Sequence, residues 1–412
     1  MRICLLTRGS RGDVQPYVGL GAALAAAGHH VIVGAPLAFA GLVRSAGLSF
    51  HPQEPDPRLV AGPGGPRRWL RPSVKARALG LWAAWLQGPA ALGSVEGQSA
   101  ACHRADLLIY PAWLAPVALR LERANRLQAI PAYLAPLHPT DSFPSPFLEP
   151  WPRGLSNRLS HHLAWWFGHA LLGGGLASGV SVGGRLSSQG MLPPHGEVCL
   201  YGYSHNLLPP PNDWPVGPVV TGPWWLAPDP AWRPPVGLDR FLRRPGKVIF
   251  VGFGSMMDDR PAQLNAIVQA ALAELDCRAV VAVGPAGQLN LKPSPRVYPV
   301  EDVPHSWLFP QVDAVVHHGG AGTTAEALRA GKPSVVVPFF GDQRFWGARL
   351  ARMQVALSPL PRRSLTMARL AQAIGRALDA PDLRHRAEQL GVSVRSERGL
   401  ERAVEAIEAA AA

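Results

Sequence analysis

Cysteine is rare in this sequence of 412 residues, and it never recurs at short spacing. Cys4, Cys102, Cys199 and Cys277 lie far apart, which argues against a Cys-x-x-Cys zinc site and against a disulfide framework. The chain also lacks any Asp-x-Asp pair, the usual carboxylate pair for a nucleotide-bound magnesium ion, so we expect no metal. No long apolar run of the kind found in signal peptides follows the first residues, and a cytoplasmic location is expected.

Lysine is also rare, since Lys75, Lys247, Lys292 and Lys332 are the only ones, although the formal net charge is +12. Arginine therefore carries almost all of the positive charge. Basic chains often bind nucleic acid, anionic membranes or phosphate-bearing ligands. No stretch alternates arginine with aromatic residues as a nucleic-acid platform does, so we expect no nucleic acid and arginines scattered over the solvated surface.

Charged side chains are absent from residues 159–184, a length that would allow a membrane span. Three histidines, several serines and three consecutive glycines interrupt this stretch, whereas a spanning helix is more uniformly apolar. We therefore expect a soluble helix over 157–172, followed by a glycine-rich loop. Peripheral membrane contact is one interpretation of the basic segment 67–71 (Arg-Arg-Trp-Leu-Arg), and an exposed loop explains that segment equally well.

Two parts of the chain each begin with an apolar strand, a glycine-bearing turn and a helix. In the first, residues 3–7 predict the strand, and Pro16 is expected to open a helix that runs to residue 27. In the second, residues 247–252 predict the strand, and Pro261 opens the helix. This order predicts parallel sheets with right-handed crossovers, an α/β fold. Further strands are expected at 30–34, 106–110, 128–133, 278–283, 313–316 and 334–337.

Proline and tryptophan are concentrated between residues 208 and 245, which is poor material for a helix or a central strand. We place an interdomain linker at 221–245, between a domain formed by 1–220 and a second domain formed by 246–394. Residues 395–412 are expected to form a C-terminal helix that packs back on the first domain.

Residues 318–324, expected between a strand and a helix N-terminus, carry the strongest signal for a binding site. Ligands of open α/β sheets bind beyond the carboxyl ends of the strands. Glycines allow the backbone to approach a ligand, free N–H groups at the helix start suit a phosphate, and Thr323 and Glu326 can add polar contacts. A capped helix after a tight turn is the alternative interpretation, and the segment is neither a P-loop nor a Gly-x-Gly-x-x-Gly motif.

Two further strand ends carry carboxylates. Asp342 and Gln343 follow a predicted strand, and a carboxylate beside a carboxamide can chelate the vicinal hydroxyls of a sugar. The alternative for Asp342 is a helix N-cap. In the first turn, Asp13 is well placed to take a proton, and capping of the helix N-terminus by Asp13 fits the spacing equally well.

These segments resemble those of a known family. Residues 9–16 (Gly-Ser-Arg-Gly-Asp-Val-Gln-Pro) resemble the opening of sterol-glucosyltransferase-like and antibiotic-type bacterial members of the GT-B, UDP-glycosyltransferase superfamily (family 1). Residues 303–310, 317–324 and 338–346 resemble the nucleotide-sugar signature of the same group, in the same order, whereas 40–200 show little match. The resemblance implies a GT-B fold, in which two Rossmann-like parallel-sheet domains face each other across a cleft. The first would bind the acceptor and the second the nucleotide sugar.

Carried over by position, the resemblance implies a role for each matching residue. Asp13 would be the catalytic base. His318 would contact the donor diphosphate and Glu326 the ribose hydroxyls, whereas Asp342 and Gln343 would bind the donor sugar. The other donor-binding positions would be Ser10, Gly12, Ser255, Val303, Gly320, Gly322 and Thr323.

The implied reaction is inverting transfer of a hexose, glucose from UDP-glucose, to a hydroxyl of a hydrophobic acceptor such as a sterol, a flavonoid or a polyketide aglycone. The UDP-sugar is a substrate, no cofactor is expected, and a thymidine deoxysugar is the alternative donor. Trp151, Trp165 and Trp166 predict an acceptor pocket, although a core helix with a tryptophan pair fits them as well. The alternative functions are a sugar-nucleotide epimerase, a lipid-linked GlcNAc transferase and a non-catalytic nucleotide-sugar-binding helper.

Overall fold

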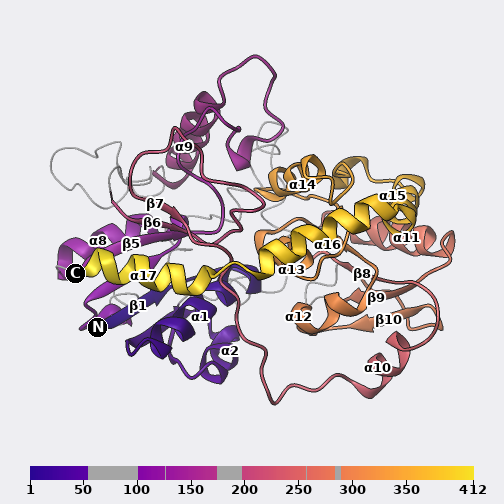
Figure 1. Cartoon of the computed structure of the whole chain (residues 1–412), viewed down its shortest axis with the longest axis horizontal. Coiled ribbons are helices and arrows are strands. Elements are labelled where there is room, and N and C mark those ends of the chain that lie inside the picture. Colours follow the sequence, from indigo (N-terminus) through magenta and orange to yellow (C-terminus); the bar gives the residue numbers. More distant parts are fainter. Residues whose placement is uncertain (54–100, 126, 174–196, 257, 284–288) are drawn as a thin grey trace. The chain divides into compact units, whose positions relative to one another are not determined.

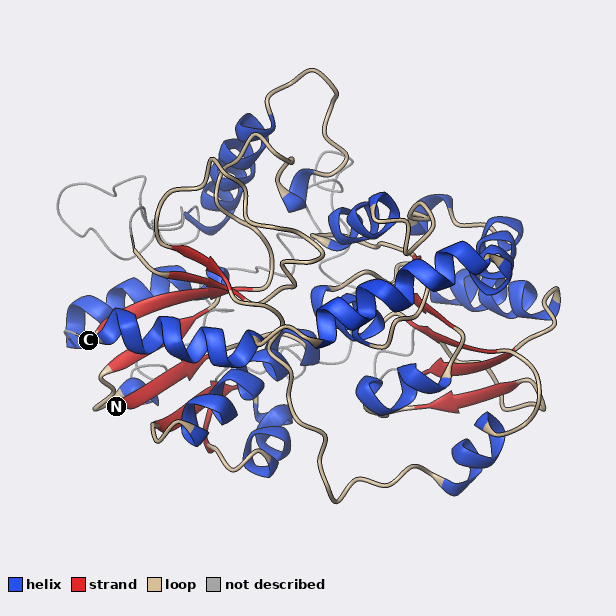
Figure 2. Ribbon diagram, in the orientation of Figure 1, coloured by secondary structure: helices blue, strands red, loops and turns tan. Residues whose placement is uncertain are grey.

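The computed structural model describes residues 1–53, 101–125, 127–173, 197–256, 258–283 and 289–412. The chain divides into two compact units. Unit 1 contains Met1–His205, Pro209–Ala227 and Arg398–Ala412, and unit 2 contains Asn206–Leu208 and Pro228–Glu397. Each unit has its own parallel sheet with helices packed against it (Figures 1 and 2).

Unit 1 is built on a seven-stranded parallel sheet. Its strands are β1 (Arg2–Leu6), β2 (His30–Ala35), β3 (Ser49–Pro52), β4 (Leu107–Tyr110), β5 (Gln128–Tyr133), β6 (Cys199–Tyr201) and β7 (Pro218–Val220). Their order is β3-β2-β1-β4-β5-β6-β7, so the direction of progression reverses between β1 and β4. This is the order of a Rossmann-type sheet, whose ligands bind beyond the carboxyl strand ends at the reversal.

Four of the described helices of unit 1 pack apolar side chains against this sheet, namely α1 (Arg11–Ala26), α2 (Ala40–Ser45), α8 (Ala115–Asn125) and α17 (Gly399–Ala411). The described part of unit 1 also contains α9 (Asn157–Gly173). The C-terminal helix α17, yellow in Figure 1, buries Ala403 and Ile407 in the same apolar cluster as Leu5 of β1 and Tyr17 of α1. Burial of this apolar face attaches the last residues of the chain to unit 1.

The expectation that Pro16 opens the first helix is wrong, because α1 begins at Arg11. Ser10 and Asp13 form a capping box, in which the Asp13 Oδ2 atom accepts hydrogen bonds from the N–H and the hydroxyl of Ser10, both at 2.8 Å. This cap starts the helix before the proline. Pro16 then lies in the second turn, where its missing N–H leaves the Gly12 carbonyl without its helical partner.

Unit 2 is built on a five-stranded parallel sheet. Its strands are β8 (Val248–Gly252), β9 (Arg278–Ala282), β10 (Val297–Val300), β11 (Ala314–His317) and β12 (Ser334–Val336). Their order is β10-β9-β8-β11-β12, with the reversal between β8 and β11. Alternate residues of β8 enter opposite cores, since Ile249 and Val251 belong to one apolar cluster, and Val248 and Phe250 to another.

Both faces of this second sheet are covered by helices, as its all-parallel topology requires. Leu264 of α11 and Leu370 of α15 pack on the face of Ile249, and Leu238 of α10 and Leu308 of α12 on the opposite face. The helices of unit 2 are α10 (Val236–Leu242), α11 (Pro261–Ala273), α12 (His305–Leu308), α13 (Ala321–Arg329), α14 (Gln343–Arg352), α15 (Met367–Asp379) and α16 (Pro381–Arg395).

The segment 221–245, expected as a linker, contributes to both cores. Trp224 is 3% exposed within unit 1, and its indole N–H donates to Thr221 Oγ1 at 2.9 Å. Leu238 and Phe241 of α10 are buried in unit 2. Within this segment the chain passes from one unit to the other between Ala227 and Pro228, so the segment contains core residues of both units.

Candidate functional site

Three loops follow three adjacent parallel strands of unit 2. β8 pairs with β11 and β11 pairs with β12, each in parallel. The carboxyl ends of all three strands therefore lie at one edge of the sheet, on both sides of the reversal point where Rossmann-type sheets bind ligands. The loops that leave this edge carry Ser255, His318 and Asp342, three of the residues predicted to bind the donor.

His318 lies between two glycines. A Cβ atom at Gly254 would lie 3.0 Å from His318 Cε1, and one at Gly320 would lie 2.4 Å from His318 Nε2, so larger residues would displace the ring. Burial lowers the pKa of His318 to about 4, and the imidazole is neutral at pH 7. A neutral ring donates from one nitrogen, so His318 can bind an anion as a hydrogen-bond donor and not as a cation.

Four buried polar atoms near the start of α13 have no hydrogen-bond partner among the described residues. They are His317 Nε2, His318 Nδ1, Thr324 Oγ1 and Glu326 Oε2. Arg329 Nη1 lies 3.9 Å from Glu326 Oε2, and burial still raises the pKa of Glu326 to about 7. Buried polar atoms are almost always hydrogen-bonded, so this group predicts a ligand that supplies the missing partners.

The turn before α13 presents backbone N–H groups to the same place. Gly320 is the N-cap residue, and Gly322 and Thr323 lie half-buried in the first turn, where N–H groups have no partner within the helix. Gly319 has a φ of +92°, a conformation that favours glycine. His317, which sequence reasoning missed, accepts a hydrogen bond from the Gly319 N–H on its Nδ1 atom at 3.1 Å and so holds the turn.

Asp342 and Gln343 lie at the start of α14, and both side chains already have protein partners. The Asp342 Oδ2 atom accepts a hydrogen bond from the indole N–H of Trp346 at 2.9 Å, and the side chain does not cap the helix, although Asp342 occupies the N-cap position. Gln343 is 4% exposed, and its Oε1 atom accepts hydrogen bonds from the N–H groups of Phe339 (2.8 Å) and Phe340 (3.2 Å). Sugar binding by this pair stays a prediction, and Gln343 also holds its own loop.

The other predicted donor contacts differ in exposure. Ser255 is exposed in the loop after β8. Val303 is half-buried before α12 and packs against a core cluster of unit 2. Ser10 and Gly12 belong to unit 1, where Ser10 is the N-cap of α1 and Gly12 is exposed in its first turn.

Asp13 lies in the first turn of α1, the helix that follows the carboxyl end of β1 at the reversal point of the unit 1 sheet. Capping of the helix by Asp13 is confirmed by the two hydrogen bonds from Ser10. Burial raises the pKa of Asp13 to about 6, against the lowering effect of those hydrogen bonds. Gly9, at a φ of +116°, leaves room for the carboxylate, because a Cβ there would lie 2.6 Å from Asp13 Oδ2. The same carboxylate is ionised at pH 7 and is a stronger base than an ordinary aspartate.

Ser10→Ala is expected to move the acidic limb of the pH–rate profile above its wild-type midpoint near pH 6. The variant loses the hydroxyl hydrogen bond that lowers the pKa of Asp13. With Asp13 as the catalytic base that the resemblance implies, activity requires the deprotonated carboxylate and therefore falls at a higher pH. The measurement is kcat/KM across the acidic and neutral range. Ser45→Ala, at an exposed serine of α2, is the control. An acidic limb at the same pH in Ser10→Ala and wild type would show that the limb does not report the ionisation of Asp13.

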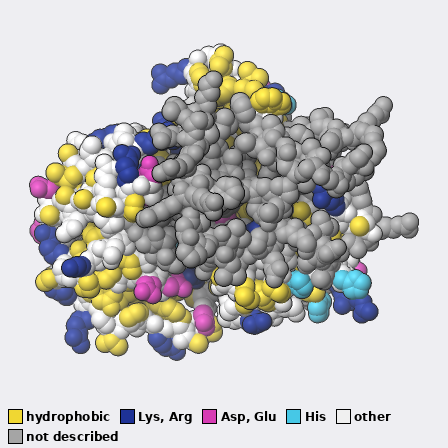
Figure 3. Space-filling view, turned by 180° about the vertical axis from the view of Figure 1, so that it is seen from behind, with side chains coloured by type: hydrophobic (Ala, Val, Ile, Leu, Met, Phe, Trp, Pro, Cys, Tyr) yellow, Lys and Arg dark blue, Asp and Glu magenta, His cyan; other side chains and the backbone are white. Residues whose placement is uncertain are grey.

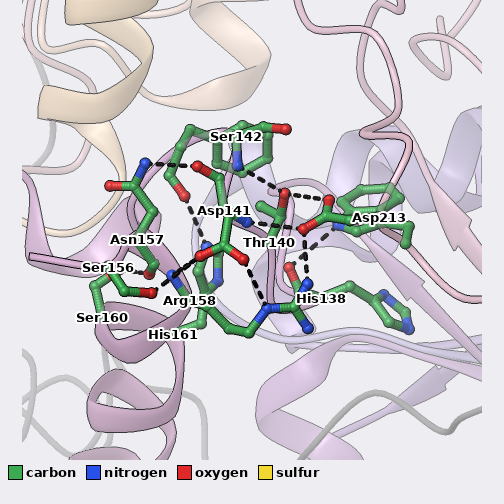
Figure 4. Close-up of polar contacts among 12 residues, drawn as sticks. His138, Thr140, Asp141, Ser142, Ser156, Asn157, Arg158, Ser160, His161 and Asp213 are labelled. Atoms are coloured by element: carbon green, nitrogen blue, oxygen red, sulfur yellow. Dashed lines mark hydrogen bonds and ion pairs between the residues drawn. The ribbon is translucent and has the colours of Figure 1, made fainter.

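Figure 4 shows Arg158 of α9 between two aspartates of unit 1. Arg158 Nε donates to Asp141 Oδ2 at 3.1 Å, and Arg158 Nη2 donates to Asp213 Oδ2 at 2.7 Å. Thr140 Oγ1 donates to the other Asp213 oxygen at 2.6 Å. Hydrogen bonds from Arg158 and Ser156 keep the pKa of Asp141 below its ordinary value. The network joins the start of α9 to the loop after β5 and to the segment before β7.

The predicted acceptor residues lie on or beside α9. The Trp165 indole N–H donates to the Leu137 carbonyl at 3.4 Å, and this side chain is half-buried. Trp166 is 63% exposed, so the alternative of a buried tryptophan pair is wrong for Trp166. Trp151 is half-buried, and its buried indole nitrogen has no hydrogen-bond partner among the described residues. A pocket formed by these residues stays a prediction.

The described side chains on the face drawn in Figure 3 form no single basic patch. On the described part of the face in Figure 3, Arg and Lys side chains are scattered among other types. The basic segment 67–71 lies outside the described residues. Within the described ranges, no helix is long and apolar enough to cross a membrane, and no three His, Cys, Asp or Glu side chains gather as a metal site requires.

Comparison with known proteins gives two matching families. Residues 3–87 match the glycosyltransferase family 28 N-terminal domain, and residues 266–407 match the erythromycin biosynthesis protein CIII-like, C-terminal domain. O-mycaminosyltylonolide 6-deoxyallosyltransferase of Streptomyces fradiae is 34% identical over 445 residues, which cover 99% of this chain and 97% of that protein. The chain belongs to the family-1 GT-B glycosyltransferases. The predicted family is confirmed.

This GT-B chain also matches larger proteins. Sterol 3-beta-glucosyltransferase of Neosartorya fischeri is 31% identical over 431 residues, which cover 99% of the chain and 29% of the relative. The chain therefore spans about three tenths of the length of that fungal relative.

Solved structures confirm the predicted GT-B fold, two Rossmann-like parallel-sheet domains. The glycotransferase of kitacinnamycin has a TM-score of 0.67 and 22% identity, covering 99% of this chain and 98% of that one. SsfS6 of Streptomyces sp. SF2575, complexed with thymidine diphosphate, has a TM-score of 0.62 and 20% identity, covering 99% of both chains.

Proposed function

We propose that this GT-B chain is an inverting glycosyltransferase that moves a hexose, glucose from UDP-glucose, to a hydroxyl group of a hydrophobic small molecule. The observation that carries the proposal is the group of buried atoms without a hydrogen-bond partner at the start of α13, which includes His318 Nδ1, Thr324 Oγ1 and Glu326 Oε2. A nucleoside diphosphate offers the matching chemistry, because its phosphate oxygens accept hydrogen bonds from His318 and Thr324. Its ribose hydroxyls donate to Glu326.

The donor half of the proposed reaction is electrostatic. The leaving diphosphate gains negative charge as the glycosidic bond breaks, and the first N–H groups of α13 lie at the positive end of a helix dipole. The neutral His318 ring adds one N–H donor. We propose no metal and no cofactor for this step, in line with the lack of an Asp-x-Asp pair.

The acceptor half is a proton transfer coupled to a single displacement. The acceptor oxygen forms a bond to the anomeric carbon while the bond from that carbon to the diphosphate oxygen breaks, which inverts the configuration. The hydroxyl proton passes to Asp13. Both of the carboxylate's described hydrogen bonds go to Oδ2, so we assign the proton to Oδ1. General-base help of this kind typically contributes about 10²- to 10⁴-fold.

A hydrophobic acceptor with a hydroxyl group is supported by two observations. Trp166 presents an exposed aromatic surface on α9, and Trp165 lies beside it on the same helix. The relatives at 31% and 34% identity are a sterol 3-beta-glucosyltransferase and an O-mycaminosyltylonolide 6-deoxyallosyltransferase, whose names indicate acceptors of this kind. We propose a sterol, a flavonoid or a polyketide aglycone.

Thymidine diphosphate sugars are the second candidate donor class. SsfS6, which shares the fold, was crystallised with thymidine diphosphate. The deciding experiment is a panel of UDP- and TDP-sugars against sterol, flavonoid and polyketide alcohols, read by product mass. We expect a hexose adduct with UDP-glucose, an inverted anomeric centre by NMR, and unchanged activity in EDTA. Hydrolysis or epimerisation without an adduct would overturn the proposal.

Asp342→Ala is expected to weaken binding of the intact donor about tenfold, while the affinity for free UDP stays within about twofold. The variant loses a hydrogen bond between the Asp342 carboxylate and a sugar hydroxyl, and free UDP has no sugar to make that bond. The measurement is calorimetric binding of UDP and of UDP-glucose without acceptor. Asp382→Ala, in the exposed first turn of α16, is the control. Equal weakening of both ligands would contradict sugar contact by Asp342.

A further inference from the structure

Two of the loops at the proposed donor site are joined to each other by side chains. The first, the Ser255 loop, contains residues 253–256 and 258–260 after β8, and the second, the Asp342 loop, contains residues 337–342 after β12. The rings of Phe253 and Phe339 lie 5.5 Å apart between centroids. The Gln343 Nε2 atom, at the end of the second loop, lies 2.9 Å from the Met256 sulfur in the first.

Arg362 makes the strongest of these connections. Its backbone N–H donates to the Pro338 carbonyl at 3.1 Å, which ties it to the Asp342 loop. Its side chain reaches the Ser255 loop, where Nε donates to Asp258 Oδ2 at 2.5 Å and Nη2 donates to the Arg260 carbonyl at 3.2 Å. Nη2 also lies 3.4 Å from the Gln263 side-chain oxygen, at the start of α11.

The ion pair between Arg362 and Asp258 is buried, with side chains 8% and 2% exposed. A buried ion pair is a weak source of stability, because desolvation of both charges offsets their attraction and apolar replacements are often neutral. What such a pair does provide is a fixed geometry, since a planar guanidinium with three described acceptors holds one orientation. Here that geometry joins the two loops that carry Ser255 and Asp342.

We propose that Arg362 is a positioning residue that locks the Ser255 loop and the Asp342 loop in one arrangement, so that the donor diphosphate and the donor sugar meet a single preformed surface. The inference rests on the proposed function. Misplacement of binding groups by about 1 Å can cost up to about a hundredfold in rate, so the lock should appear in donor kinetics.

The test separates positioning from stability with paired variants. Arg362→Met alone leaves Asp258 buried without its partner and should lower the melting temperature. The double variant Asp258→Asn/Arg362→Met contains no lone buried charge and should recover that temperature. We expect the donor KM of the double variant to stay raised about tenfold, with the acceptor KM unchanged within about twofold. The control is Lys247→Met, which breaks an exposed ion pair with Asp379 before β8.

The outcomes are distinct. A double variant with wild-type melting temperature and wild-type donor KM would show that the ion pair is only structural and would overturn the inference. If the double variant fails to fold, Arg362→Lys provides the test. Lysine keeps the positive charge, but one ammonium group cannot reach Asp258, Arg260 and Gln263 together. An unchanged donor KM in Arg362→Lys would then overturn the inference, and a threefold or larger rise supports it. Wild-type protein that transfers no sugar refutes the proposed function instead.

Discussion

Asp13→Asn is expected to lower turnover about a thousandfold while the affinity for UDP stays within about twofold of the wild type. Asparagine has the size of aspartate and can accept the Ser10 hydrogen bonds that cap α1, so the fold of the turn is kept. It cannot take a proton from an acceptor hydroxyl, so the general-base contribution is lost. The measurement is kcat from product formation, together with UDP binding by calorimetry.

The control for this variant is Asp106→Asn in the same unit. Asp106 Oδ2 accepts a hydrogen bond from the Arg2 N–H at 2.7 Å, at the amino end of β1 and away from the carboxyl strand ends. We expect this control to keep normal turnover. If Asp13→Asn also turns over normally, Asp13 is not the base, and a pH profile without an acidic limb near pH 6 would support that conclusion.

Glu326→Gln is expected to raise the stability of unit 2 by about 3 kcal/mol above pH 7, and to leave it nearly unchanged near pH 4. The pKa of Glu326 is raised from 4.5 to about 7 by burial in the folded state. Below the unfolded pKa both states are protonated, and the folded state carries no penalty. As the pH rises from 4.5 to 7, Glu326 ionises first in the unfolded state, which lowers the free energy of unfolding. Glutamine does not ionise, so the variant keeps that stability.

The measurement is calorimetric unfolding of wild type and variant at both pH values. Glu274→Gln, at an exposed position after α11, is the control and should change little at either pH. An equal gain at both pH values would show that the effect is not linked to ionisation. Above pH 7, the same Glu326→Gln variant should bind UDP about tenfold more weakly, because a ribose hydroxyl loses an ionised acceptor. A substitution that raises stability and weakens ligand binding is typical of a functional site.

Much of the fold follows from local sequence patterns. The strand at 128–133 is confirmed with its predicted bounds, and the helix expected over 157–172 is α9, Asn157–Gly173. The two strand–turn–helix starts also appear, because apolar runs and glycine turns act within a few residues. The start of α1 differs from the predicted start for a physical reason: the capping box of Ser10 and Asp13 outweighs the preference of Pro16 for the first helical position.

The candidate site was predictable only in part. Glycine spacing and strand ends indicate His318, Glu326 and Asp342, and parallel pairing of β8, β11 and β12 brings their loops to one edge. The Arg158 network and the Arg362 contact were not predictable. Their members are separated by 55 and 104 residues along the chain, and no local pattern links them.

The sequence by itself indicated the family through the resemblance of its motifs. It also determined the two α/β units and the strand ends that carry polar residues, because backbone preferences and apolar periodicity are local. Only the tertiary structure decided which of their polar atoms are buried without a hydrogen-bond partner, that Gln343 holds the loop backbone, and that the pKa of Asp13 is raised to about 6. Desolvation and hydrogen-bond partners depend on atoms that come from distant parts of the chain. They exist only once the sheet and its helices have packed.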